Sequence, residues 1–416
     1  MAGFAATPES PVNRRGTHAV TARRHDIDAL RVFAFALLIL YHTAMVYVAD
    51  WDYHIKSAHT AEWLQWPMIF MNRWRMSLLF LISGIAIALA APEGRPWRFA
   101  GSRTWRLMLP LVFGMFVIVP IQPYCEGVAN GHLAPGFFRF LASYWHVHRW
   151  PRGSFTGAEH GMTWNHLWYL PYLWAYTLAL VALMPVLASS WAKRAVAWLS
   201  RCNAVILLGM PSLVILFYNL YLLPRFPATD AFFGDWCQHA KYGTVFLAGY
   251  LLGRSDTFWA RVTVDRRRNT VMALASIALY FLPGIAGALL PPGAWAFRLP
   301  GMFWHMLTES AQALYLWTAL LAILGWGKAL LDRPFRWLPY CTEAVYPWYM
   351  LHQSLIIALV FWLQPLDLGP WAEPLLVVGG TVVGCYTLHE FMIRRVTWLR
   401  PLFGLKPKQV PQRRGI

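Results

Sequence analysis

Charged residues are scarce in this chain of 416 residues, where Asp, Glu, Lys and Arg together make up 13%, against about 25% in an average soluble domain. Apolar residues make up 58% and form long blocks, among them 32–48, 107–121, 204–223 and 351–363. Blocks of this length approach or reach the roughly 20 residues that cross a bilayer. The composition therefore disfavours a soluble enzyme, a nucleic-acid-binding module and a disordered protein, and it predicts an all-α, polytopic membrane protein.

Cysteine is also scarce, and a cleavable signal is not visible. The five cysteines show no CxxC spacing, which argues against a structural zinc site, and no other cluster has metal-ligand spacing. Cys125 and Cys237 fall on the outer side of the topology predicted below and can pair there, but sequence alone does not fix disulfide connectivity. No apolar stretch precedes the arginines of residues 1–25, which we interpret as a disordered, basic cytoplasmic tail.

The apolar blocks predict ten transmembrane helices, and the basic residues predict how they are oriented. The helices are expected at about 28–49, 68–90, 105–122, 167–187, 203–224, 238–253, 270–291, 301–327, 340–363 and 374–393. With a cytoplasmic N-terminus, 27 of the 36 Lys and Arg residues lie on the cytoplasmic side and 9 lie on the other. This asymmetry follows the positive-inside rule, so the net charge of +17 reflects topology and anionic lipid headgroups instead of nucleic acid. We predict cytoplasmic termini, a transmembrane domain over 26–395 and a basic tail over 396–416.

The first predicted span carries two ionisable residues on one face. Arg31 and His42 are eleven positions apart, which places them within about 20° of three full turns and roughly 16 Å apart along the axis. Ionisable residues inside a span are costly and by default functional. Arg31 can instead extend to the cytoplasmic headgroups. His42 lies deep in the outer half of the span, so we interpret it as a general base in preference to a packed histidine.

Arginine pairs flank the next two spans. Arg73 and Arg75 precede the second span on the outer side, against the charge rule, where they meet either lipid phosphates or an anionic group of a substrate. Arg103 and Arg106 lie three residues apart at the cytoplasmic end of the third span. They either bracket a phosphate or anchor the helix to the headgroups. Gly84, in the middle of the second span, permits close approach of another helix.

Polar residues in later spans predict a pocket inside the membrane. A glutamate within a span needs a partner, and His305 is the nearest candidate for Glu309 in the sequence. The residues expected to bind a substrate there are Arg75, His166, Trp168, His305, Glu309, Tyr349 and His352. The long outer loop at about 123–166 is rich in histidine and tryptophan, which either form an interfacial belt or stack on the faces of a carbohydrate.

Together, these motifs resemble the membrane-bound acyltransferase-3 family over about 25–395. The resemblance rests on Arg31 and His42 with ten residues between them, LFLISG at 79–84, Arg103 with Arg106, and the runs that begin at His166 and Tyr349. The arrangement at 75–84 is similar to the glucan biosynthesis protein C branch of that family, which is associated with succinylation of periplasmic glucans.

The resemblance implies about ten helices and transfer of an acyl group from cytoplasmic acyl-CoA to a hydroxyl across the membrane. His42 matches the catalytic position, and Arg31, Arg103 and Arg106 match positions linked to the donor. We therefore expect a multi-pass O-acyltransferase of the inner membrane that needs no metal. It would transfer succinyl or acetyl from the corresponding acyl-CoA to a carbohydrate acceptor at the outer face.

Two questions stay open on the sequence alone. The oxyanion formed in such a reaction is expected to be stabilised by His166 or Tyr349. The alternative of a different class is a transporter or exporter of a glycan or lipid precursor, in which the histidine within the first span would relay protons.

The predicted topology can be tested by cysteine labelling from outside the cell. A membrane-impermeant reagent is expected to reach a cysteine placed at Gly153 and to miss one placed at Arg267, because the basic segment 265–268 is assigned to the cytoplasm. Labelling with the opposite pattern would contradict the orientation and the number of spans.

Overall fold

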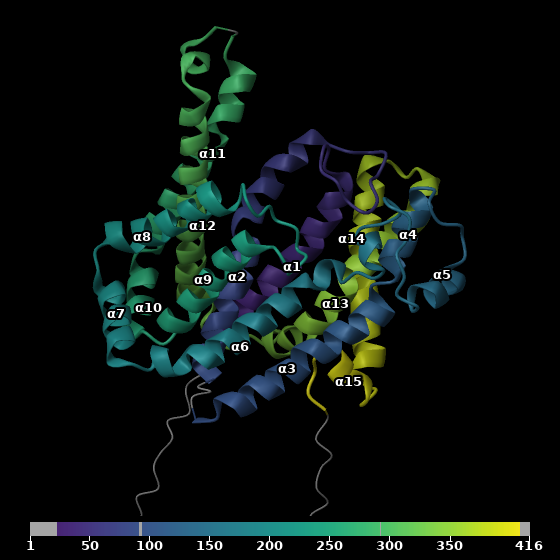
Figure 1. Cartoon of the computed structure of the whole chain (residues 1–416), viewed down its shortest axis with the longest axis horizontal. Coiled ribbons are helices and arrows are strands. Elements are labelled where there is room, and N and C mark those ends of the chain that lie inside the picture. Colours follow the sequence, from purple (N-terminus) through teal and green to yellow (C-terminus); the bar gives the residue numbers. More distant parts are fainter. Residues whose placement is uncertain (1–22, 91–93, 292, 408–416) are drawn as a thin grey trace, which may run out of the picture.

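The computed structural model describes residues 23–90, 94–291 and 293–407, and most of that part of the chain is helical (Figure 1). Within those residues the only β-type pairing is one isolated bridge between Val48 and Ala61, and nine segments are long and apolar enough to cross a membrane. In chain order these are α1 (His25–Tyr47), η1 with α2 (Glu62–Leu64, Gln65–Ala90), α3 with η3 and α4 (Pro96–Phe113, Gly114–Ile118, Ile121–Ala129), η5 with α6 (Asn165–Trp168, Tyr169–Leu187), α8 with η6 (Ala204–Phe217, Tyr218–Leu222), α11 (Arg266–Leu289), α12 (Gly301–Leu331), α13 with η8 (Leu338–Leu363, Gln364–Leu366) and α14 with η9 (Gly369–Thr387, Leu388–Ile393). The predicted all-α polytopic fold is confirmed.

The tenth predicted span corresponds to α9, Trp236–Leu252. This helix has 17 residues and is therefore about 25 Å long, slightly less than the roughly 30 Å of a hydrocarbon core. It is also shorter than each of the nine segments given above, of which the shortest has 19 residues. Its role as the tenth span stays a prediction.

Short elements connect the spans. They are α5 (Phe137–Tyr144) and η4 (Ala158–His160) in the long predicted outer loop, α7 (Ser190–Arg201), α10 (Asp256–Val264), η7 (Trp295–Arg298) and α15 (Leu399–Leu402). Of the two predicted tails, residues 1–22 and 408–416 lie outside the described chain. The second tail contains the short helix α15, which packs on α3.

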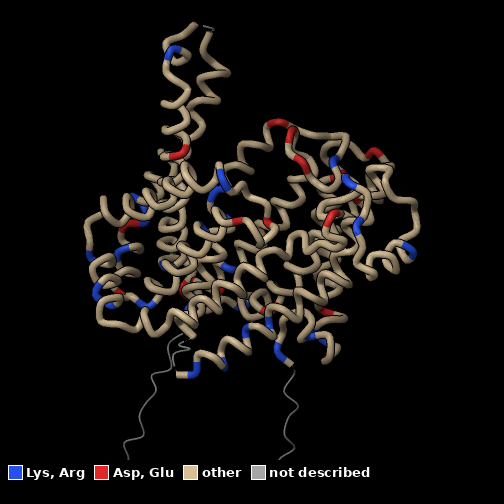
Figure 2. The backbone as a smooth tube through the Cα atoms, viewed as in Figure 1, with Lys and Arg blue, Asp and Glu red and all other residues tan. Residues whose placement is uncertain are grey.

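Basic residues gather at the end of the bundle that carries both described chain ends (Figure 2). Arg24 lies over the ring of Trp259 in α10, with its guanidinium carbon 3.9 Å from the ring centroid. Arg400 of α15 pairs with Glu343 of α13 at 3.2 Å. The positive-inside rule assigns these segments to one side of the membrane. The contacts place them at the same end of the molecule. The assignment of that end to the cytoplasm stays a prediction.

The disulfide considered from the sequence is not formed. Cys125 on α4 and Cys237 on α9 are both buried free thiols. Cys125 packs among apolar residues, including Val46 and Ile356, while the Cys237 thiol lies 3.6 Å from the carbonyl oxygen of Tyr218.

Helix α13 occupies the position that matters most for the site, because it packs against α1, α4 and α14. It holds Pro347 in its interior, where proline removes a backbone N–H from the helical ladder. Polar and aromatic residues that follow this proline face the neighbouring elements, and many of them are buried.

Helices α2 and α9 pack with their backbones nearly in contact, through one glycine from each helix. A Cβ atom at Gly84 would lie 2.0 Å from the carbonyl oxygen of Phe246, and one at Gly249 would lie 2.2 Å from that of Leu81. The sequence-based role of Gly84 as a packing residue is therefore supported by the geometry. Small residues permit such close approach inside a membrane, where van der Waals packing between helices replaces the hydrophobic effect.

Replacing Gly249 by alanine is expected to destabilise the protein, because the added methyl group meets backbone that cannot move aside. We expect a loss of about 1–3 kcal/mol, as for other overpacked sites, measured as a lower midpoint of thermal unfolding in detergent. Gly284→Ala on α11 is the matched control, since a Cβ there meets nothing within 4 Å and alanine is the better helix former. Equal midpoints for the two variants would contradict this account of the α2–α9 contact.

Candidate functional site

The centre of the candidate site is a pair of histidines from α1 and α13. Nδ1 of His42 lies 2.8 Å from Nε2 of His352, and the two rings are nearly parallel, with an interplanar angle of 16°. His352 is 1% exposed. Its Nδ1 lies 2.8 Å from the carbonyl oxygen of Tyr349 and 3.1 Å from that of Trp348. The structure thus joins two predicted site residues that are 310 positions apart in the sequence.

His166, on η5, is a third imidazole in this cluster, and its ring centroid is 5.2 Å from that of His352. Its two nitrogens are both engaged: Nε2 donates to the carbonyl oxygen of Met350, and Nδ1 accepts from the side-chain amide of Gln122, each at 3.2 Å. The Tyr349 hydroxyl donates to the carbonyl oxygen of His166 at 2.7 Å. Because these hydrogen atoms are already used, the geometry gives no support to the expectation that His166 or Tyr349 stabilises an oxyanion; it supports a positioning role for both.

Three consecutive residues of α13 reach three different parts of the molecule. His352 meets α1, as described above. Gln353 donates through its amide nitrogen to His54 at 3.1 Å and to the side-chain oxygen of Gln122 at 3.2 Å. Ser354 accepts from the side-chain amide of Gln122 at 2.8 Å and donates to the carbonyl oxygen of Ile118 at the same distance. Successive residues of a helix point about 100° apart, so one turn of α13 organises α1, α4 and the segment after α1 that carries His54.

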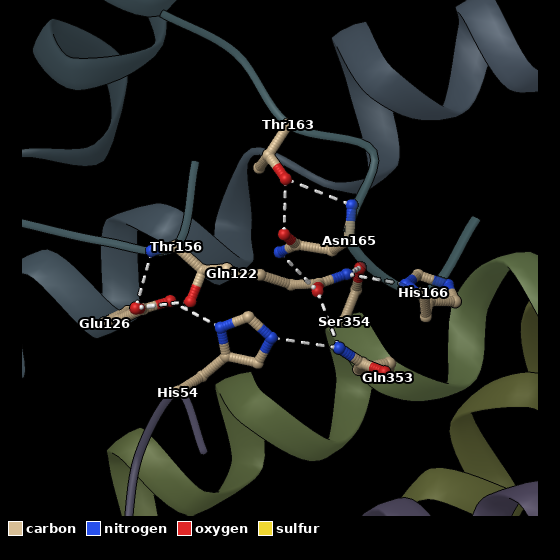
Figure 3. A network of polar contacts seen from close by, with 9 residues as sticks. All are labelled: His54, Gln122, Glu126, Thr156, Thr163, Asn165, His166, Gln353 and Ser354. Carbon is tan, nitrogen blue, oxygen red and sulfur yellow. Dashed lines mark hydrogen bonds and ion pairs between the residues drawn. The ribbon is translucent and has the colours of Figure 1, made fainter. Parts of the chain in front are cut away.

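The same network continues into the long outer loop (Figure 3). Glu126 of α4 accepts from the backbone N–H of Thr156 at 2.7 Å and from its hydroxyl at 2.9 Å, and it also pairs with His54. Asn165 donates to the side-chain oxygen of Gln122 at 2.9 Å. These contacts hold the predicted outer loop against the middle of α13, next to the histidine pair.

Sequence reasoning missed most of this network. Gln122 and Glu126 are four positions apart, so they share a face of the helix that ends the third span, and this spacing was an available signal. His54 carried no such signal, because it lies in an irregular segment and its partner Glu126 is 72 positions away.

Arg75 lies beside the histidine pair with an unpaired charge. It is 6% exposed, and its guanidinium carbon lies 3.5 Å from the centroid of the Tyr41 ring. Its Nε and Nη1 have no hydrogen-bond partner, and it forms no ion pair with a carboxylate in the part of the chain that the structure describes. Asp230, in the loop before α9, acts on Arg75 only at a distance, and its own burial raises its pKa to about 6. Arg73 is bound differently, since it donates to the hydroxyl of Tyr280.

The three arginines that the resemblance relates to a donor form a second group. Arg31, Arg103 and Arg106 lie close enough for their charges to act on one another. Arg106 donates through Nε to the carbonyl oxygen of Gly404 at 3.1 Å, and Arg31 lies 3.7 Å from Asp28. The buried Nε of Arg103 has no partner among the described residues. Three mutually repelling cations, one of which has an unpaired buried donor, form a suitable site for an anion.

Three other predicted site residues lie apart from the histidine pair. Trp168 packs between aromatic rings of neighbouring helices, 5.2 Å from Tyr172 and 5.9 Å from Tyr242. His305 is exposed on the hairpin of α11 and α12 that projects from the bundle (Figure 1). Glu309 lies one turn further along α12, where its buried Oε2 has no partner within the described chain. The structure does not bring His305 or Glu309 to the site, because the hairpin carries them away from α13.

Comparison with known proteins agrees with this picture. A family model described as an acyltransferase domain matches residues 24–390. A protein named "Glucans biosynthesis protein C" from Escherichia coli is 22% identical over 405 residues, a match that covers 92% of this chain and 95% of the relative. The protein of the same name from Salmonella dublin is 23% identical over 401 residues, with the same coverage. No solved structure matches this chain.

Proposed function

The chain belongs to the acyltransferase-3 family, and on this premise we propose that it transfers an acyl group from cytoplasmic acyl-CoA to a carbohydrate hydroxyl at the outer face of the inner membrane. The observation that carries the proposal is the contact between His42 and His352, which places the histidine of the family motif in a partly buried, hydrogen-bonded position. The names of the relatives support a glucan as the acceptor. Family membership also favours an acyltransferase over the transporter considered from the sequence.

In the proposed reaction His42 acts as the general base. The acceptor hydroxyl gives its proton to His42 as its oxygen attacks the thioester carbonyl, so that a carbon–oxygen bond forms. The carbon–sulfur bond then breaks, and the proton passes from His42 to the departing thiolate of CoA. Atoms and charge balance without any further reactant, and the histidine returns to its starting state.

The donor is proposed to lie along the face of α1 that carries Arg31 and His42. Phosphate groups of CoA would bind Arg31, Arg103 and Arg106, whose charges act on one another and among which Arg103 has an unpaired buried Nε. Arginine forms strong, forked hydrogen bonds to phosphate. The thin pantetheine arm would then span the roughly 16 Å that separate Arg31 from His42 along the helix.

The acyl group in this proposal carries a terminal carboxylate, as succinyl does, with acetyl as the alternative. Arg75 supports this choice, because it is a buried cation with two unbonded N–H positions and no paired carboxylate among the described residues. A buried charge is costly unless it is paired. A carboxylate on the acyl group would supply the missing partner beside His42.

The direct test is an assay of the purified protein with succinyl-CoA or acetyl-CoA and a glucan acceptor, followed by mass spectrometry of the glucan. A mass increase equal to one acyl group is expected with one of the donors. If the folded protein neither binds nor consumes acyl-CoA, the proposed function is contradicted and the transporter hypothesis is reopened.

Substitutions at the two ends of the α1 face are expected to separate binding from chemistry. His42→Gln keeps a side chain of similar size but removes the base, so turnover should fall by roughly 10²–10⁴ while acyl-CoA still binds. Arg31→Ala should weaken acyl-CoA binding first, by about 1.5–3 kcal/mol for a lost charge-assisted hydrogen bond. Single-turnover transfer and acyl-CoA binding, measured on well-folded variants, distinguish the two. Turnover of His42→Gln within about threefold of wild type would exclude His42 as a base of that strength.

Replacing Arg75 by alanine tests the acyl group. If the guanidinium binds the terminal carboxylate, Arg75→Ala should reduce transfer of succinyl much more than transfer of acetyl, as measured by kcat/KM with the two donors. Arg73→Ala is a suitable comparison, because Arg73 already binds Tyr280 and should affect both donors alike. Equal losses for both donors in Arg75→Ala would leave Arg75 with a structural role or a headgroup contact.

A further inference from the structure

The proton on His352 can be located from its partners. Nδ1 of His352 faces two backbone carbonyl oxygens, those of Trp348 and Tyr349, at 3.1 and 2.8 Å. A carbonyl oxygen only accepts hydrogen bonds, so Nδ1 of His352 must carry a hydrogen atom. In a neutral ring the other nitrogen, Nε2, is then bare and acts as an acceptor.

His352 is neutral for a reason that is also visible in the structure. The ring is 1% exposed, and among the described residues no carboxylate pairs with it. The Arg75 guanidinium lies close enough to oppose a positive charge on either histidine. A buried imidazolium would therefore be an unpaired charge beside another unpaired charge, which is strongly unfavourable.

The hydrogen atom on Nδ1 of His352 and the neutral charge of that ring determine which nitrogen of His42 carries hydrogen. Its Nδ1 lies 2.8 Å from the bare Nε2 of His352, so Nδ1 of His42 must donate and must carry the hydrogen atom. Nε2 of His42 is then the bare nitrogen, and in the part of the chain that the structure describes no side chain or backbone group bonds to it. His42 is left with one free basic nitrogen.

We infer that His352 is a positioning residue that fixes the proton of His42 on Nδ1 and so keeps Nε2 available as the base. The inference rests on the proposed function, in which His42 takes the acceptor proton. It replaces the sequence-based assignment of His352 to substrate binding, because both nitrogens of His352 are used within the protein.

The path of the proton through the proposed reaction follows from this arrangement. The acceptor proton binds Nε2 of His42 and gives an imidazolium whose Nδ1–H still donates to His352. When His42 returns the proton from Nε2 to the thiolate, the original form is restored. His352 neither gains nor loses a proton in the cycle; it acts as a hydrogen-bond acceptor that holds the ring orientation and the position of the hydrogen atom.

The wild-type protein tests the inference directly. Nitrogen-15 NMR of protein labelled at histidine, with the His42 signals assigned by comparison with His42→Gln, reports which ring nitrogen carries hydrogen. We expect Nδ1 of His42 to be protonated and Nε2 to be bare at neutral pH. A hydrogen atom on Nε2 of His42 would overturn the inference, whatever the variants do.

Variants of His352 test its effect on turnover. His352→Leu removes the acceptor, and we expect kcat to fall about tenfold or more, within the 10²–10⁴ that a general base contributes, with acyl-CoA affinity unchanged. His352→Gln presents an amide oxygen of similar reach and should restore part of kcat. His389→Leu is the matched control: His389 is a fully buried histidine on η9, outside the site, and its loss should leave kcat unchanged.

A double substitution separates this role from a purely structural one. In a His42→Gln background His352→Leu should cause little further loss of the residual activity, because the group that it positions is gone. A structural role would instead lower activity by the same factor in both backgrounds, which would overturn the inference. If His42→Gln retains wild-type turnover, the proposed function fails. If His42→Gln is inactive and His352→Leu is fully active, only the present inference fails.

Discussion

Inside an apolar bundle every polar group must find a partner within the protein, and this constraint determines how the helices around α13 are arranged. An unsatisfied group in hydrocarbon costs several kcal/mol. The imidazole, amide and hydroxyl of residues 352–354 point in different directions around α13. Each forms hydrogen bonds with a different part of the structure. The positions of α1, α4 and the segment that carries His54 relative to α13 are therefore coupled. The same contacts that stabilise the packing also orient the histidine pair.

Two arginines near α1 are among the buried polar groups without a partner in the described chain. Arg75 and Arg103 both have buried nitrogen atoms of this kind; Arg75 lies near His42, and Arg103 lies near Arg31. By contrast, the polar side chains of the network around Gln122 are paired with one another. The proposed donor would bring negative charge to both of these arginines. Its phosphates would lie at Arg103, and its acyl carboxylate would lie at Arg75.

The sequence predicted the architecture and the centre of the site, but not the supporting network. Spans follow from local hydropathy, and the common face of Arg31 and His42 follows from helix geometry, so both needed no tertiary information. The contact between His54 and Glu126 joins an irregular segment to a helix 72 positions away, which no periodic pattern encodes. The assignment of His305 and Glu309 relied on their spacing along α12, whereas the direction of the projecting hairpin depends on how α11 and α12 pack together.

A histidine rather than a carboxylate behind the proposed base suits a site within a membrane. A carboxylate would add a permanent buried negative charge, whereas His352 leaves the resting pair neutral, so the pair itself adds no buried ion between turnovers. The cost appears only during reaction, when His42 becomes positively charged near Arg75. Two adjacent cations would repel each other in this low-dielectric environment. A donor carboxylate bound to Arg75 would offset that repulsion, so in the proposed reaction the correct acyl group would both occupy its site and make proton transfer to His42 less costly. Selection of the donor and activation of the base would then depend on the same pair of charges.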